Sequence, residues 1–205
     1  MQTVTSVYSS EYRIKGSKFL GFLSPSSTVD EIESQLELIK KKHPTATHHC
    51  YAYILKPNEP VEFSTDAGEP SGTAGLPILN ALKSQNLMNV LLIVVRYYGG
   101  TKLGKSGLID AYQTISDQTI HSSVLKQLVP VKTYQLKYDY SQQSFIDKWR
   151  NNFPLIEINS SYTESVELTV GCPKSESKQF EETVSAHKHQ LINFETAGES
   201  FHIEE

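Results

Sequence analysis

One stretch of the sequence matches a nucleotide-binding pattern. Residues 99–106 read GGTKLGKS, which satisfies the phosphate-loop pattern G-x-x-x-x-G-K-[ST]. In such a loop the backbone N–H groups surround a phosphate, the lysine reaches the terminal phosphates, and the Ser or Thr hydroxyl binds magnesium. An apolar run at 89–95 precedes the stretch and a helical pattern follows it, so the local order is strand, loop, helix.

The wider sequence argues against a nucleotide hydrolase. A phosphate-loop enzyme needs a parallel core of several buried apolar strands and a second strand that ends in a magnesium-binding Asp. Only the run at 90–95 is apolar enough, and the nearest second candidate, 134–139, alternates polar and apolar residues. We therefore interpret the match as accidental and expect Lys105 and Ser106 to tolerate substitution. We expect the opposite of the loop glycines Gly100 and Gly104, which a tight loop needs for positive φ or close backbone approach.

Further candidate binding residues lie in a polar loop at 64–75 and at Arg96, which follows the apolar run. The guanidinium of Arg96 suits either a bound phosphate or a carboxylate such as that of Glu69. One interpretation is therefore a binding site, and the other is an internal pair of Arg96 with an acidic residue. In the same structural alternative, Ser71 or Thr73 caps the helix that follows the loop.

The remaining candidates are histidines and aromatic residues. His48 shares a predicted strand face with Cys50, which favours a hydrogen-bonded core histidine over a general base. Its neighbour His49 points to the opposite face of the strand, so the two do not bind one metal ion, and we expect no metal and no cofactor. Tyr97 and Tyr98 either stack on a base or pack into the core.

Composition describes an ordinary globular protein. The chain has 205 residues, of which 38% are hydrophobic and 20% charged, and its two cysteines lie far apart, which predicts no disulfide framework. The first residues lack the apolar stretch of a secretion signal, and the longest apolar run falls well short of the about 20 residues that cross a bilayer. We expect a cytoplasmic protein with no membrane partner.

The order of predicted elements indicates an α+β protein with two domains, 1–130 and 131–205, joined near 128–131. In the first domain, Thr28 to Glu31 form a capping box that opens a helix. Residues 1–130 hold 12 Lys and Arg against 11 Asp and Glu, whereas 131–205 hold 7 against 12, so the second domain is the acidic one. Neither charge balance is that of a general polyanion-binding protein.

The second domain has the predicted order β-α-β-β-α-β, which is the split βαβ or ferredoxin-like pattern. Within it we expect Ser141 to cap the first helix, a hairpin turn at 159–162, Pro173 to begin the second helix, and a last strand near 192–196.

Three stretches resemble the signature motifs of the YigZ/Impact family. Residues 65–79 read TDAGEPSGTAGLPIL, close to the family's D-D-G-E-P-S-G-T-A-G-x-P-I-L. Residues 95–104 read VRYYGGTKLG and are followed by AY at 111–112, similar to V-R-Y-F-G-G-x-K-L-G-x-G-G-L-x-R-A-Y. The strand at 46–53 is similar to a third signature, and with the acidic second domain the resemblance covers nearly the whole chain.

The chain departs from these motifs at two positions. Ala67 stands where a second acidic residue is common, which argues against paired carboxylates or a metal there. Asp110 stands where an Arg is common, which removes one positive charge close to the glycine loop.

The resemblance implies a first domain similar to the second domain of ribosomal protein S5 and a ferredoxin-like second domain similar to those of elongation factor G. Eukaryotic Impact proteins regulate translation, and for bacterial members the family implies an association with translation or the ribosome. Such an inference from family and fold is an analogy and does not identify a reaction.

We favour a binding protein over an enzyme. The expected site is a groove between the loops at 64–75 and 96–104, and the expected partner is RNA, the ribosome or a translation-factor protein. The alternative is an enzyme that acts on a small phosphorylated or nucleotide ligand in the same groove. The candidate binding residues are His48, Asp66, Gly68, Glu69, Pro70, Ser71, Gly72, Thr73, Arg96, Tyr97, Gly99, Gly100, Lys102 and Gly104.

Overall fold

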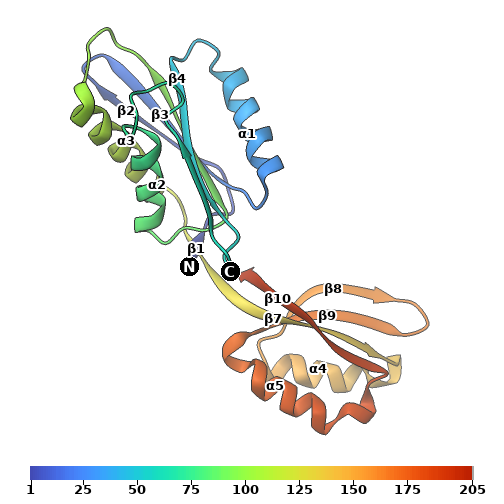
Figure 1. Ribbon diagram of the computed structural model, residues 1–205. Helices are drawn as coiled ribbons and strands as arrows, with labels where there is room; N and C mark the ends of the chain where they lie inside the picture. Colours follow the sequence, from blue (N-terminus) through green and yellow to red (C-terminus); the bar gives the residue numbers. More distant parts are fainter. Residues whose placement is uncertain (205) are drawn as a thin grey trace. The chain divides into compact units, whose positions relative to one another are not determined.

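A computed structural model describes residues 1–204 and shows two compact units, 1–127 and 128–204 (Figure 1). Each unit contains an antiparallel β-sheet covered by helices, so the chain is an α+β protein. Among the described helices, none is both long and apolar enough to cross a membrane.

The first unit is built on a five-stranded sheet in the order β2-β3-β6-β4-β5, with every neighbouring pair antiparallel. A short strand, β1 (Gln2–Thr3), pairs with the beginning of β7. The elements of the unit are β2 (Tyr8–Ile14), β3 (Ser17–Pro25), α1 (Val29–Lys42), β4 (His48–Leu55), β5 (Val61–Thr65), α2 (Gly75–Ser84), β6 (Val90–Tyr97) and α3 (Gly104–His121).

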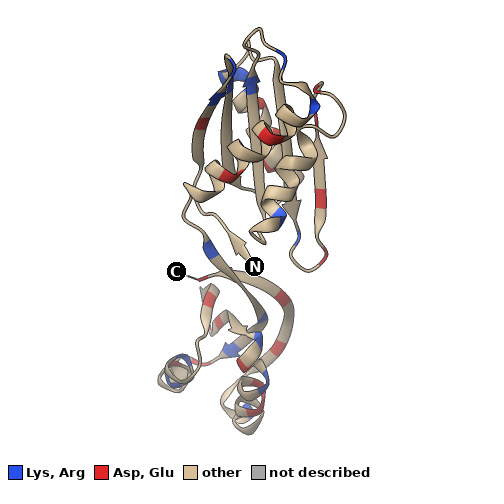
Figure 2. Ribbon diagram, turned by 90° about the vertical axis from the view of Figure 1, so that its left-hand side faces the viewer, with Lys and Arg blue, Asp and Glu red and all other residues tan. Residues whose placement is uncertain are grey.

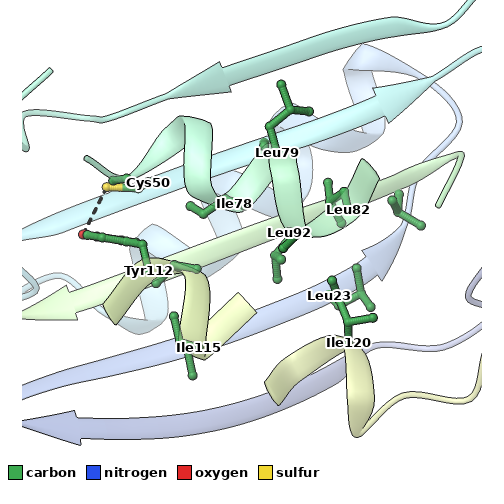
Figure 3. Close-up of a cluster of buried hydrophobic side chains, with 14 of the residues drawn as sticks. Leu23, Cys50, Ile78, Leu79, Leu82, Leu92, Tyr112, Ile115 and Ile120 are labelled. Atoms are coloured by element: carbon green, nitrogen blue, oxygen red, sulfur yellow. Dashed lines mark hydrogen bonds between the residues drawn. The ribbon is translucent and has the colours of Figure 1, made fainter. Parts of the chain in front are cut away.

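Helices cover both faces of this sheet, with α1 on one face and α2 and α3 on the other (Figure 1). Strand β6 lies in the middle, where Leu92 and Val94 pack toward α2 and α3 and Leu91 and Ile93 pack toward α1. Figure 3 shows the cluster on the α2 and α3 side. Because both faces are covered, residues 90–95 are at most 1% exposed, which explains their unbroken apolar run.

The first residues of α1 and α3 lie where the sequence predicted them. The hydroxyl of Thr28 accepts a hydrogen bond from the N–H of Glu31 at 3.2 Å, and α1 begins at the next residue. Helix α3 begins at Gly104, which places Lys105 and Ser106 in its first, exposed turn.

The topology confirms that the phosphate-loop match is accidental. Strand β6, which leads into the glycine loop, is antiparallel to both of its neighbours, β3 and β4. A phosphate loop instead belongs to a sheet with a parallel core. The glycines serve the backbone: Gly100 and Gly104 have φ of 83° and 75°, as the need for positive φ predicted.

The second unit has the predicted element order. Its sheet has the order β10-β7-β9-β8, with every pair antiparallel, and both helices lie on one face (Figure 1). The elements are β7 (Lys126–Tyr138), α4 (Gln143–Asn152), β8 (Ile156–Tyr162), β9 (Val166–Pro173), α5 (Lys174–Ala186) and β10 (Asn193–Ile203), with short 3₁₀ helices at Tyr140–Gln142 and Lys188–Gln190.

Two local predictions in this region were wrong. Ser141 caps no helix, because it lies inside the 3₁₀ turn that precedes α4. The hairpin turn falls at 163–165 instead of 159–162, because the polar residues at the end of β8 continue to pair with β9. The boundary between the two units, 127/128, falls next to the expected junction at 128–131 and lies within the continuous strand β7.

A methyl group on Gly99 cannot be accommodated. Its Cβ would lie 1.8 Å from the carbonyl carbon of Gly16 and 2.1 Å from the nitrogen of Ser17. We expect Gly99→Ala to lower the free energy of unfolding by about 3 kcal/mol. Urea denaturation measures this change.

Two further variants serve as controls for that measurement. Gly104→Ala meets no neighbouring atom but keeps a positive φ, so we expect a loss of about 1 kcal/mol. The exposed Lys105→Ala should change stability by less than about 0.5 kcal/mol. A wild-type unfolding midpoint for Gly99→Ala would contradict the close contact with Gly16.

Candidate binding surface at the loop end of the first unit

One end of the first sheet collects most of the predicted site residues. At this end β2 turns into β3, β4 begins, and β5 and β6 finish. The register places Lys18 opposite Tyr97 and His48 opposite Arg96. The loops that lead into α2 and α3 therefore start from the same end of the sheet, and we call this region the loop end.

A buried ion pair connects the two loops. Arg96 Nη1 donates to Glu69 Oε1 at 2.6 Å, and the two residues are 5% and 8% exposed. The hydroxyl of Tyr112, on α3, donates to the same carboxylate oxygen at 2.8 Å, and Arg96 Nη2 donates to the Ser17 hydroxyl at 3.4 Å. The carboxylate is thus neutralised and hydrogen-bonded inside the unit, as a buried charge requires.

This pair decides between the two interpretations of Arg96. Arg96 and Glu69 were candidates for ligand contact, but their charged groups face each other, and the alternative of an internal Arg–Glu pair is what the structure contains. The pair joins the loops at 64–75 and 96–104 directly.

Asp66 anchors the first loop to the start of α2. Its carboxylate accepts backbone N–H bonds from Gly72 at 2.8 Å and from Ala74 and Gly75 at 2.9 Å. Burial by itself would raise the pKa of Asp66, but these amide bonds together outweigh it and hold the pKa below its usual value.

The prediction that Ser71 or Thr73 caps this helix was wrong. Ala74 occupies the cap position, and the hydroxyl of Thr73 turns back to donate to the carbonyl of Pro70 at 2.6 Å. Asp66 supplies the acceptor instead, because the loop folds back and brings its carboxylate over the free amides of the helix.

Cys50 lies beneath this loop as a protonated thiol. Its sulfur is 2.9 Å from the carbonyl oxygen of Asp66 and 3.3 Å from the hydroxyl of Tyr112, the contact drawn in Figure 3. Burial raises the pKa of Cys50 to about 12, so the thiolate that a nucleophile requires does not form near neutral pH.

His48 faces the ion pair from the edge of the loop. Its Nδ1 lies 3.0 Å from the carbonyl oxygen of Ala67, which accepts only, so Nδ1 carries the hydrogen. Its Nε2 lies 3.9 Å from Glu69 Oε2. Ala67, which supplies this carbonyl, has a φ of 44°, and the next residue, Gly68, has a φ of 90°.

The structure distinguishes the two neighbouring tyrosines, Tyr97 and Tyr98, for which the sequence did not decide between stacking on a base and packing into the core. Tyr97 is half-buried, and its hydroxyl lies 2.9 Å from His43 Nδ1. Tyr98 is 46% exposed. Tyr97, a predicted binding residue, is therefore mainly a packing residue, and Tyr98 is the aromatic side chain at the surface.

The other candidates lie on the outside of the loop end. Sequence reasoning missed Ser17 and did not include Tyr112 among the site residues, although Tyr112 ends the second motif and gave a usable signal. Within residues 1–204, no cluster of three or more His, Cys, Asp or Glu side chains is placed to bind a metal ion. The exposed candidates are Gly68, Pro70, Ser71, Gly72, Gly99, Gly100, Lys102 and Gly104.

Comparison with known proteins identifies the family. The profile of the Impact N-terminal domain matches residues 15–120, which include the whole loop end from the β2–β3 turn to α3. The chain belongs to the Impact family.

Relatives and a solved structure extend the match beyond the first unit. The Impact family members YvyE of Bacillus subtilis and YigZ of Escherichia coli are 36% and 32% identical to this chain, over 88% and 82% of it and 83% of each relative. A crystal structure of a hypothetical protein superposes with a TM-score of 0.67 at 27% identity, covering 95% of both chains. Protein IMPACT of Rattus norvegicus is 33% identical over 43% of this chain and 29% of its own length.

The geometry gives the Impact motifs of this chain a common physical role. The first motif supplies Glu69, the second supplies Arg96 at its start, and Tyr112 lies at its end. These three residues form one hydrogen-bonded group in the interior. The motifs therefore build the scaffold of the loop end, and the residues available to a partner are the ones that point outward from it.

The cap formed by Asp66 predicts a pH dependence. A carboxyl group whose pKa is lowered by folding stabilises the protein above its unfolded pKa, about 3.9, and this contribution is lost as the pH falls through the folded value. We expect Asp66→Asn to lose about 2 kcal/mol near neutral pH and to approach wild type below about pH 4. Denaturation at several pH values tests this, with the exposed Asp110→Asn as control. A difference that is independent of pH would contradict the assignment.

The ion pair predicts strong coupling between its members. Arg96→Met leaves a carboxylate buried without its cation, so we expect a loss of about 3–5 kcal/mol in the free energy of unfolding. The double variant Arg96→Met and Glu69→Leu should lose less free energy of unfolding than the two single variants lose together. A double-mutant cycle in urea measures this coupling. Additive effects would show that the two side chains act independently.

Proposed function

We propose that this chain is a cytoplasmic regulatory protein of translation, which contacts RNA, the ribosome or a ribosome-associated protein through the loop end of its first unit. Membership of the Impact family supports the connection to translation, because eukaryotic members regulate it. The location of the proposed binding surface rests on the distribution of charge in the first unit.

Positive charge gathers at the loop end. Figure 2 shows Lys and Arg concentrated at the top of the first unit as drawn, which corresponds to the β2–β3 turn, the end of α1 and the glycine loop. We call this set the basic end. Its members are Arg13, Lys15, Lys18, Lys40, Lys41, Lys42, Lys102 and Lys105.

The acidic side chains of the same region cancel only part of this charge at the surface. Asp66 binds backbone amides and Glu69 binds Arg96, so both carboxylates point inward. Glu11 pairs with Arg13 and Lys18. In the part of the chain that the structure describes, no salt bridge involves Lys15, Lys40, Lys42, Lys102 or Lys105, and all five are exposed.

The proposal includes two fold relationships. We infer that the first domain, 1–130, resembles the second domain of ribosomal protein S5, and that the second, 131–205, is a ferredoxin-like domain similar to those of elongation factor G. The strand order β10-β7-β9-β8, with two helices on one face, supports the second relationship because it is the arrangement of a split βαβ fold.

Ribosome co-sedimentation over a range of salt concentrations tests the proposed function. We expect association at low salt that weakens as salt rises, because exposed charges are screened. The triple variant Lys15→Glu, Lys42→Glu and Lys102→Glu should lose it.

A matched variant controls for net charge. Lys56, Lys148 and Lys178 are exposed and lie outside the basic end, so replacing all three by Glu makes the same charge change elsewhere. We expect this variant to sediment with ribosomes as wild type does. Equal loss in both triple variants, or no association at low salt, would contradict the proposal.

A further inference from the structure

Tyr98 is the exposed aromatic side chain of the loop end, and its position is fixed. Its backbone N–H donates to the hydroxyl of Thr47 at 3.1 Å. The guanidinium of Arg96 lies 5.5 Å from the centre of its ring, so one side of the ring rests on the buried ion pair. The side chain is still 46% exposed. Tyr98 thus presents a flat apolar face supported from behind by a cation.

Three segments that carry cations meet at the end of β6, where Tyr98 follows. The turn with Lys15 contacts the glycine loop directly, because Gly99 packs on Gly16 and donates its N–H to the Ser17 hydroxyl at 3.2 Å. The glycine loop itself carries Lys102.

The end of α1 reaches the end of β6 from the other face of the sheet, through His43, which lies beside Tyr97. Burial, followed by the charges of Lys18 and Lys42, lowers the pKa of His43. Positive charge from Lys18 and Lys42 therefore lies close to His43 and its neighbour Tyr97.

We propose that single-stranded RNA binds across the basic end, with one base stacked on the outer face of Tyr98 and the flanking phosphates bound by Lys15, Lys42 and Lys102. This inference rests on the proposed function and names its partner and its contacts. An aromatic platform within a positively charged surface is the combination that binds single strands, because every base has a face that stacks and every linkage carries a negative charge.

Other macromolecules fit this surface less well. A duplex keeps its bases stacked inside, so it offers no base face to Tyr98. A protein partner needs a central apolar anchor that is shielded from water, whereas here a lone aromatic ring stands among exposed lysines. Ser71 and Gly72 at the neighbouring loop add polar surface and little apolar area.

Fluorescence anisotropy with a labelled single-stranded RNA of about ten nucleotides tests the proposal. We expect Tyr98→Ala to weaken binding by about tenfold without changing the dependence on salt, since no charge is removed. Tyr98→Phe should bind as wild type does. Tyr162→Ala, which removes a tyrosine that is 61% exposed in the second unit, is the matched control and should have no effect.

The lysine contacts have a separate signature. Replacing Lys42 or Lys102 by Gln should weaken binding and reduce the slope of log affinity against log salt by about 0.7 each. Lys56→Gln and Lys148→Gln should leave the slope unchanged. Thermal unfolding establishes that each variant is folded, and Tyr98→Leu, which keeps the bulk of the side chain without its aromatic face, repeats the stacking test.

Three results would overturn the inference: wild-type affinity in both Tyr98→Ala and Tyr98→Leu, equal or tighter binding of a duplex of the same sequence, or no RNA binding at low salt. If ribosome association persists while RNA binding is absent, the inference fails and the proposed function stands on a protein contact. If both are absent, both fail.

Discussion

The loop end depends on the ion pair between Glu69 and Arg96. A carboxylate that is 8% exposed is tolerated only when a cation and further donors replace its water shell, and Arg96 and Tyr112 do so here. Because these three residues come from the first loop, the end of β6 and the body of α3, satisfying one buried charge fixes three segments relative to one another. Loops that are held by a rigid scaffold in this way are suited to recognition.

The same interaction determines which charges reach the surface. Glu69 is used internally and Asp66 caps α2, so the first loop contributes little negative charge outside, while the lysines around it remain exposed. The result is a strong local field in a unit whose net charge is close to zero. Residues 131–205 carry 7 Lys and Arg against 12 Asp and Glu, so the excess negative charge of the chain lies in the second domain.

The sequence by itself determined the features that depend on neighbours along the chain. The apolar run at 90–95 predicted a strand covered on both faces, Thr28 predicted the start of α1, and the alternation and turn residues after 131 predicted the order β-α-β-β-α-β. The motifs identified the family and located the loops that carry its residues. Each of these signals acts within a few residues, so no knowledge of tertiary contacts was needed to interpret it.

Only the tertiary structure decided how distant residues are used. Arg96 had two possible partners in the sequence, and the packing of the loop on β6 selected Glu69, which lies 27 residues away. The cap of α2 comes from Asp66 instead of the adjacent hydroxyls, because the loop folds back over the helix. Tyr97, the last residue of β6, is half-buried beside His43, whereas Tyr98, just beyond the strand, is exposed. The basic end exists because three chain segments, the β2–β3 turn, the end of α1 and the glycine loop, lie at the same end of the sheet. The order of strands in space, which no local pattern encodes, sets that arrangement.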